Sequence, residues 1–212
     1  MPAFAGMTMS CGAQYEMDST PRILTIGNSR HSLERFIALL KTAEVNGVAD
    51  VRSAPVSRFS PHFNKTALAA SLAAQGIDYV FLGATLGGRP DRPEMYTQGV
   101  ADYEKMAASP EFHAGLARLK DLAAERRVAV ICAEADPLDC HRCLLVGRAL
   151  AEAGHDVAHI LVSGDIVSHA EIEGRLLEMA KLNSQDLLGA SRAERLAEAY
   201  RSRSRKAGHA KR

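Results

Sequence analysis

The sequence predicts an α/β fold, a single three-layer α/β/α domain built on a mostly parallel sheet of five strands. Short apolar runs rich in β-branched residues alternate with segments whose apolar residues recur at helical spacing. Strands that alternate with helices form parallel sheets with helices on both faces. The 212 residues, 47% of them hydrophobic, are enough for one domain with a sizeable core.

The expected elements follow one another in a regular order. Strands are expected at 23–26, 48–51, 78–82, 127–131 and 157–161, where short apolar runs end in turns or polar loops. Helices are expected at 33–43, 64–74, 100–107, 110–124, 140–153 (beginning at Cys140 or His141) and 169–181. Ser32 and Asn64 stand where the N-caps of the first two helices belong. The connection 83–98 has a length that usually indicates function or mobility.

Both ends of the chain are expected to lie outside a domain that spans 22–183. Residues 1–21 have no apolar periodicity and lack the basic start and apolar core of a signal peptide, which predicts a disordered extension. Residues 184–212 are expected to form a basic, flexible tail, because eight Lys or Arg and only two Glu fall within 192–212. Within that tail, 192–201 has the spacing of a short amphipathic helix.

Composition narrows the choice of partners. The formal net charge of +1 gives the whole molecule no steering field for nucleic acid, but the charge is uneven and the C-terminal tail is basic. No apolar run approaches the roughly 18 residues that span a bilayer, and no membrane contact is expected. Three of the four cysteines lie within twelve residues, a poor disulfide framework that fits reduced thiols in a cytoplasm. The sequence leaves the oligomeric state open.

The segment 128–143 concentrates the side chains that carry chemistry. A β-branched run ends in a cysteine, a short acidic loop follows, and Cys-His-Arg opens a helix. Open α/β folds bind ligands where a buried strand gives way to a helix. The candidate catalytic residues are therefore Cys132, Glu134, Cys140, His141 and Arg142.

Each candidate has a role that suits its chemistry. Cys132 is the candidate nucleophile, because Arg142, a charged His141 and the helix start would favour its thiolate. His141 and Glu134 are candidate acids or bases, Cys140 can resolve an oxidised thiol, and Arg142 offers a planar fork to an anion. The alternative interpretation makes Cys132 a small buried hydrophobe and the Cys-His-Arg run an ordinary helix start.

Some of the same residues could also bind a metal ion. Cys132, Cys140, His141 and His159 are of metal-ligand types, but their spacing matches no common zinc module. Cys140 and Cys143 have the CxxC spacing, which at a helix start is also a redox signature. We therefore predict no metal and no cofactor.

A second set of candidates would bind a substrate. Asp50 and Arg52 end a strand whose carboxyl end can lie beside that of the Cys132 strand, where Asp50 would orient Arg52 or His141. The turn after the first strand can offer backbone N–H groups to an anion. A basic loop with interleaved Phe59 and Phe63 suits stacked bases and phosphate, or is an ordinary loop whose Phe side chains enter the core. The candidates are Ser29, Asp50, Arg52, Ser57, Arg58 and Lys65.

Motifs in a fixed order resemble the DUF488 family, a bacterial and archaeal family without an assigned function. The matching pieces lie at 25–29, 50–58, 63–65, 77–79, 86–88, 132–134, 140–142 and 159–160. Asn28 stands where the family usually has His, so proton transfer at that position does not carry over. The resemblance implies a site built from Asp50, Arg52, Cys132, Glu134, Cys140, His141 and Arg142, and it supplies no substrate.

A weaker likeness is to rhodanese domains, which also have an Asp-Val-Arg strand end and a cysteine after a buried strand. The loop from Cys132 to Arg142 is longer and more acidic than a rhodanese anion-binding loop, so its carboxylates would repel an anion. The leading hypothesis is a small cytoplasmic, thiol-dependent enzyme with a small-molecule or anionic ligand. The alternatives are a nucleic-acid-binding or nucleic-acid-processing protein, which uses the basic tail and the Arg58–Lys65 loop, and a ligand sensor without turnover.

Overall fold

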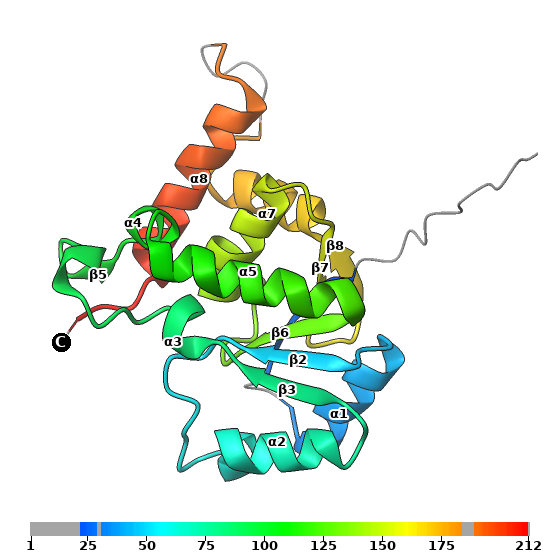
Figure 1. Ribbon diagram of the computed structural model, residues 1–212. Helices are drawn as coiled ribbons and strands as arrows, with labels where there is room; N and C mark the ends of the chain where they lie inside the picture. Colours follow the sequence, from blue (N-terminus) through cyan, green and yellow to red (C-terminus); the bar gives the residue numbers. More distant parts are fainter. Residues whose placement is uncertain (1–21, 29–30, 184–188, 212) are drawn as a thin grey trace, which may run out of the picture.

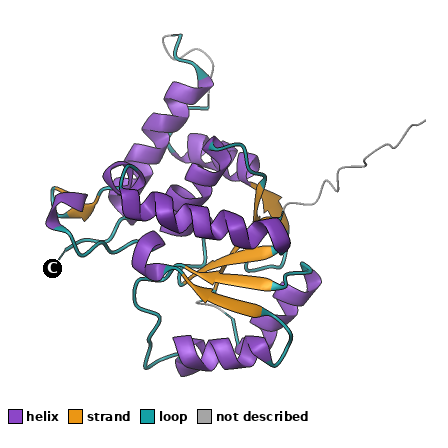
Figure 2. Ribbon diagram, viewed as in Figure 1, coloured by secondary structure: helices purple, strands orange, loops and turns teal. Residues whose placement is uncertain are grey.

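The computed structural model describes residues 22–28, 31–183 and 189–211, so the expected extension 1–21 lies outside the described residues. Helices cover both faces of a six-stranded sheet (Figures 1 and 2). In spatial order its strands are β3 (Asp78–Phe81), β2 (Gly47–Asp50), β6 (Val128–Cys132), β1 (Ile23–Gly27), β7 (Val157–Ile160) and β8 (Ile166–Ser168). This arrangement confirms the predicted α/β class.

The sheet has one strand more than expected. Five strands run parallel, and β8 pairs antiparallel with β7 at the edge. β8 has only three residues and none of them is fully buried, so it lacks the apolar run by which the other strands were predicted. The five predicted strands all form at or within about two residues of their expected positions.

Two helices cover one face of the sheet and the longer helices cover the other (Figure 1). The first face carries α1 (Leu33–Thr42) and α2 (Lys65–Ala73), and the second carries α5 (Pro110–Glu125), α7 (His169–Met179) and α8 (Arg192–Ala207). Ser32 caps α1 by accepting a hydrogen bond from the Arg35 backbone N–H at 3.2 Å, as predicted. Asn64 occupies the N-cap position of α2, but its side chain makes no capping bond there.

Shorter elements connect these layers. They are α3 (Gly83–Leu86), α4 (Tyr103–Ala107), α6 (Arg148–Glu152), the 3-10 turns Pro61–Phe63, Pro93–Met95 and Pro137–Asp139, the π-helical turn Arg142–Gly147, and the hairpin β4 (Tyr96–Thr97) and β5 (Val100–Ala101). The connection 83–98 is therefore partly ordered as α3, a 3-10 turn and β4.

Alternation along β6 decides where its last residue points. Val128, Val130 and Cys132 belong to the apolar core under α5, α7 and α8, whereas Ala129 and Ile131 face α1 and α2. Successive side chains of a strand point to opposite faces, so this pattern follows from the backbone. Cys132 therefore leaves the carboxyl end of β6 on the face covered by the C-terminal half of the chain.

The described part of the expected tail is folded. Residues 192–207 form α8, whose Leu196, Ala199 and Tyr200 are buried in the core. Beyond α8 the chain joins the β4–β5 hairpin, where the Ala101 N–H donates to the His209 carbonyl at 2.9 Å. The flexible-tail prediction is wrong for these residues, because three apolar positions among many charges suffice to dock a helix with a Ser191–Glu194 capping box.

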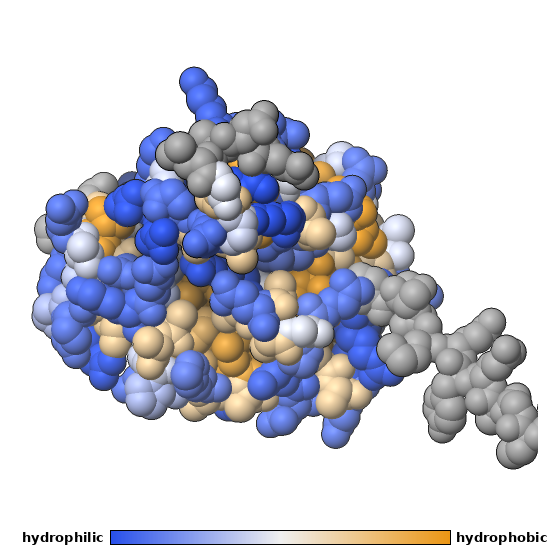
Figure 3. Space-filling model, turned by 90° about the horizontal axis from the view of Figure 1, so that it is seen from above, coloured by the Kyte–Doolittle hydropathy of each residue, from blue (hydrophilic) through white to orange (hydrophobic). Residues whose placement is uncertain are grey.

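Viewed from above, hydrophilic residues cover much of the described surface, and apolar residues gather between them near the middle of this face (Figure 3). Among the helices in the described ranges, none has the length and apolar character to cross a membrane.

Candidate functional site

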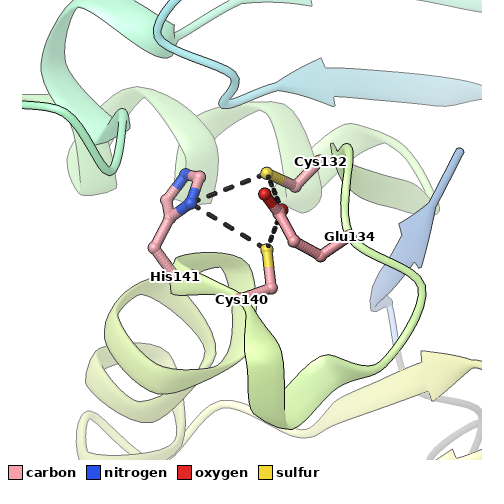
Figure 4. A group of neighbouring side chains, drawn as sticks. All are labelled: Cys132, Glu134, Cys140 and His141. Carbon is pink, nitrogen blue, oxygen red and sulfur yellow. Dashed lines mark hydrogen bonds between the residues drawn. The ribbon is translucent and has the colours of Figure 1, made fainter. Parts of the chain in front are cut away.

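A short loop turns the chain back on itself after β6. Asp136 fixes this loop, because its carboxylate accepts hydrogen bonds from the Leu138 N–H at 2.8 Å and from Arg175 at 2.7 Å. The 3-10 turn Pro137–Asp139 follows and delivers Cys140 and His141 at the start of the π-helical turn. Such π-helical turns occur frequently at functional sites. The loop thus brings Cys140 back to face Cys132 (Figure 4).

Four side chains converge there, and we call Cys132, Glu134, Cys140 and His141 the pocket cluster (Figure 4). The Glu134 Oε2 atom lies 3.0 Å from each of the two sulfurs. The His141 Nδ1 atom lies 3.6 Å from the Cys132 sulfur and 3.9 Å from the Cys140 sulfur. All four ligand-type atoms lie within 4.8 Å of one another.

The ring of His141 is held in one orientation. Its Nε2 atom lies 3.0 Å from the Val51 carbonyl oxygen, which only accepts hydrogen bonds, so Nε2 carries a proton. In the neutral ring the lone pair of Nδ1 then faces the sulfurs, and in the charged ring Nδ1 donates to them. Gly88 packs against the ring so closely that a Cβ atom there would lie 2.7 Å from Nδ1.

Burial and mutual contact set the protonation of the cluster. Burial raises the pKa of Cys132 and that of Glu134 above their ordinary values. Burial also opposes the ionisation of Cys140, but the hydrogen bond from Cys132 and the positive charges of Arg142 and His141 hold the Cys140 pKa well below its ordinary value. In the same way, the hydrogen bond to Cys140 raises the pKa of His141 against the effect of burial. These pKa shifts therefore favour a single thiolate in the pocket cluster, on Cys140.

A buried ion pair forms the opposite wall of the site. Asp50 accepts hydrogen bonds from Arg52 Nε at 2.9 Å and from Arg52 Nη2 at 2.6 Å, and the Tyr79 hydroxyl donates to it at 2.6 Å. This two-point contact fixes the plane of the guanidinium. Asp50 thus orients Arg52, while His141 takes its partner from the Val51 carbonyl instead.

A pocket of about 220 Å³ lies between these walls at the carboxyl ends of β2 and β6. Cys132, Glu134 and His141 line it, and Cys140 lies behind them in the core. The other lining residues are Arg52, Ser53, Ala54, Gly88, Arg89, Tyr103, Ala133, Asp139, Ala207 and His209.

Arg142 has a different place from the one expected. It is completely buried, and its guanidinium donates to the Glu134 carbonyl at 2.5 Å and to the Ala135 carbonyl at 3.0 Å. The loop it holds also presses on β1, since a Cβ atom on Gly27 would overlap the Glu134 carbonyl. Arg142 therefore braces the loop that carries Glu134, and the arginines that line the pocket are Arg52 and Arg89.

The basic loop after β2 does not reach the pocket. Ser57 accepts hydrogen bonds from the backbone of its own loop, Arg58 stacks on Phe59, and Lys65 lies over the ring of Phe81. Phe63 enters the core at 2% exposure, whereas Phe59 is 82% exposed. The structure thus separates Ser57, Arg58 and Lys65 from the pocket cluster, and Ser29 lies outside the described residues.

Several pocket residues were not predicted from the sequence. Arg89 directly follows the Gly-Gly pair of the family motif, and its backbone N–H donates to Ser53 at 3.0 Å. That proximity to a motif was a usable signal. His209 comes from the far end of the chain and reaches the pocket only because α8 docks, so no local pattern marks it.

A second group of metal-type side chains lies deeper in the fold. We call Cys143, His159 and His169 the core cluster, and their ligand-type atoms also lie within 4.8 Å of one another. Both ring nitrogens of each histidine are engaged: His159 bonds Thr25 at 2.8 Å and His169 at 2.9 Å, and His169 bonds the Tyr200 hydroxyl at 2.9 Å.

Comparison with known proteins identifies the family. The profile described as "Domain of unknown function DUF488" matches residues 32–149, which is more than half of the chain. The matched range holds Asp50, Arg52 and the whole pocket cluster, whereas α7, α8 and His209 lie beyond it. Searches of curated proteins and of solved structures found no match. The chain belongs to the DUF488 family.

Proposed function

We propose that this chain is an enzyme that binds a small anionic substrate and whose reaction depends on the thiols of Cys132 and Cys140. One observation carries the proposal: a single pocket is lined by the sulfur, acid and base groups of Cys132, Glu134 and His141 and by two arginines, Arg52 and Arg89. Convergent polar groups at the carboxyl ends of parallel strands are the usual make-up of an α/β active site.

The acidity of the loop does not oppose anion binding as strongly as its sequence suggests. Asp136 is paired with Arg175 at 2.7 Å, and Asp139 is paired with Arg203. Burial raises the pKa of Glu134, which favours its neutral form. Arg52 is itself paired with Asp50 at 2.6 Å, so with these carboxylates compensated it is chiefly the charge of Arg89 that attracts an anion into the pocket.

Nucleic-acid binding through the tail has less support. The arginines of α8 face carboxylates: Arg192 lies 3.2 Å from Glu173, and Arg201 lies 3.0 Å from Glu198. Salt-bridged side chains on a docked helix are poor ligands for a phosphate backbone. A pocket of about 220 Å³ instead fits a small molecule.

Two finer expectations belong to the same proposal. The reaction needs reduced Cys132 and Cys140, and all three cysteines in the described ranges are free thiols, which favours a cytoplasmic location. Rhodanese-type sulfur transfer is not proposed, because Glu134 occupies the space beside the Cys132 sulfur at 3.0 Å.

Anion binding is tested with inorganic phosphate and acetate as probes, followed by NMR shifts of the pocket residues. Arg89→Ala should weaken binding about tenfold, since a charge-assisted hydrogen bond contributes about 1.5 kcal/mol. Arg92→Ala is the matched control, an exposed arginine that pairs with Glu111 outside this pocket. Shifts that avoid the pocket, or equal affinities in wild type and Arg89→Ala, would overturn the proposal.

Thiol dependence is tested by turnover. Wild type is incubated with small phosphate and carboxylate esters and amides, and the products are followed by mass spectrometry. Any substrate consumed by wild type should survive incubation with Cys132→Ser, while Cys143→Ala should consume it normally, because Cys143 lies in the core cluster. Normal turnover by Cys132→Ser contradicts the role of the thiol.

A further inference from the structure

We propose that the pocket cluster binds one Zn²⁺ ion through the sulfurs of Cys132 and Cys140, the Nδ1 atom of His141 and a carboxylate oxygen of Glu134. The sequence spacing predicted no metal, but the folded loop brings together a donor set that the spacing does not reveal. The inference rests on the proposed function in one respect, that the ion faces the substrate pocket.

The distances fit a tetrahedral ion. With zinc–sulfur bonds of about 2.3 Å and zinc–nitrogen bonds of about 2.0–2.1 Å, a tetrahedral angle separates sulfur and nitrogen by roughly 3.6 Å. The two observed separations from His141 Nδ1 are 3.6 and 3.9 Å. Glu134 must shift, since its 3.0 Å contacts to the sulfurs are hydrogen-bond lengths and a shared ion would lengthen them to about 3.5 Å.

The histidine is already prepared as a ligand. Its Nε2 proton is held by the Val51 carbonyl at 3.0 Å, which turns the Nδ1 lone pair toward both sulfurs. Metal-binding histidines almost always donate their second ring N–H in this way, which fixes the tautomer and the ring direction. Gly88 adds a steric contact on the ring, because no side chain fits between them.

The charges balance when the ion is bound. Two thiolates and the Glu134 carboxylate carry three negative charges, and the ion together with the buried Arg142 guanidinium carries three positive ones. The Arg142 backbone N–H also lies 3.4 Å from the Cys140 sulfur, where it stabilises a thiolate. On binding, the two thiols and the carboxyl lose any protons they carry to solvent, so no electron is transferred.

The donor set selects zinc over the common hard cations. Two thiolates and an imidazole suit zinc, whereas magnesium and calcium take oxygen ligands. Glu134 is half-buried and lines the pocket, while Cys140 is buried behind it. Exchange of the Glu134 oxygen for a water or substrate oxygen would therefore open a catalytic position on the side of the pocket. In this arrangement Cys132 is a ligand rather than the nucleophile.

The test uses the full chain, purified in reductant without chelator. We expect about one zinc per chain by elemental mass spectrometry. After chelation, cobalt should give near-ultraviolet sulfur-to-cobalt bands and the strong visible bands of a tetrahedral ion. Cys140→Ser should bind zinc at least about 100-fold more weakly, and Glu134→Gln should keep the sulfur bands but change the visible ones.

Cys143→Ala is the matched control, because it removes a fully buried thiol three residues from Cys140 and should bind cobalt normally. Wild-type protein that retains no zinc and gives no sulfur-to-cobalt band overturns the inference, even if the variants fail to fold. A cobalt band with no phosphate or acetate shifts in the pocket would overturn the proposed substrate class and leave the metal site standing. Anion binding without a sulfur band would do the reverse.

Discussion

The pocket cluster and the core cluster both combine cysteine with histidine, and yet they differ in what their ring nitrogen atoms do. His141 uses Nε2 on a backbone carbonyl and directs Nδ1 at two sulfurs. His159 and His169 use all four ring nitrogens on partners inside the protein. Proximity of His and Cys alone therefore does not distinguish a ligand site from a structural network.

The core cluster forms one directed chain of hydrogen bonds. The Tyr200 hydroxyl donates to the Glu173 carboxylate at 3.3 Å, so it accepts from His169 Nε2. With both imidazoles neutral, His159 Nε2 then donates to His169, and the Thr25 hydroxyl donates to His159 Nδ1. Every donor has an acceptor, so this chain ties β1 and β7 to α7 and α8 and leaves no lone pair for a metal.

The largest expected effect is the fall in melting temperature when a chelator removes zinc from the pocket cluster. A ligand present at about 1,000 times its Kd stabilises the folded state by about 4 kcal/mol, so removing zinc should lower the melting temperature by roughly 8–16 °C. Differential scanning calorimetry with and without chelator measures this, and Cys143→Ala should show the same drop. If chelator leaves the wild-type melting temperature unchanged, zinc does not stabilise the folded protein through the pocket cluster.

A smaller effect is expected from breaking the chain of hydrogen bonds in the core cluster. His159→Leu leaves the buried Thr25 hydroxyl and His169 Nδ1 without partners, which should cost about 2–3 kcal/mol of unfolding free energy. Urea unfolding should show that loss equally with zinc and with chelator, and the zinc content should stay the same. Loss of zinc from a folded His159→Leu protein would show that the core cluster takes part in metal binding.

Acid is expected to reduce the stability that the hydrogen bonds of His159 and His169 contribute, and this effect ranks third in size. Burial lowers the pKa of both His159 and His169. Nearby positive charges on His169, Arg142 and Arg175 lower the His159 pKa further. The carboxylates of Glu173 and Glu152 partly oppose the effect of burial on the His169 pKa. The unfolded chain takes up these protons first, so their stabilising contribution is complete above about pH 6.5 and falls as the pH drops below it.

The loss should reach up to about 1.4 kcal/mol per pH unit for each histidine. Urea midpoints measured in chelator at about pH 7 and about pH 5.5 compare wild type with His159→Leu. The variant should lose less stability on acidification than wild type does. Identical losses would mean that these histidines do not stay neutral in the fold.

The smallest expected effect concerns the end of the chain. Tyr200→Phe removes the acceptor of His169 Nε2, and Glu173, 4.0 Å from that atom, can partly replace it. The unfolding free energy should therefore fall by about 1 kcal/mol. The same urea experiment checks this, and a loss as large as that of His159→Leu would show that the hydroxyl, not the imidazole pair, holds α8 in place.

Periodicity predicted most of the fold because five strands and six helical segments bury clear apolar patterns. β8 was not predicted because its three partly or fully exposed residues carry no apolar pattern. The helical spacing of 192–201 was recognised, but the docking of α8 was not, because Leu196, Ala199 and Tyr200 stand among many charges. Tertiary packing decides such elements, and the composition of the segment does not show it.

The site residues that lie close together in the sequence or at the ends of predicted strands could be predicted. Cys132, Glu134, Cys140 and His141 lie at one strand–loop–helix junction. The position of Asp50 and Arg52 at the end of a neighbouring strand predicted that they join the site, and the family motifs include both. Spacing could not predict that the 3-10 turn after Asp136 folds Cys140 back onto Cys132. It also could not predict the contribution of His209, which depends on the docking of α8.

Zinc K-edge X-ray absorption of the full-length protein tests the central claim most directly, because it counts the ligands of the bound ion. We expect two sulfur atoms at about 2.3 Å and two nitrogen or oxygen atoms at about 2.0–2.1 Å. A shell without sulfur, or one with a single sulfur and two imidazole nitrogens as the core cluster would provide, would contradict it.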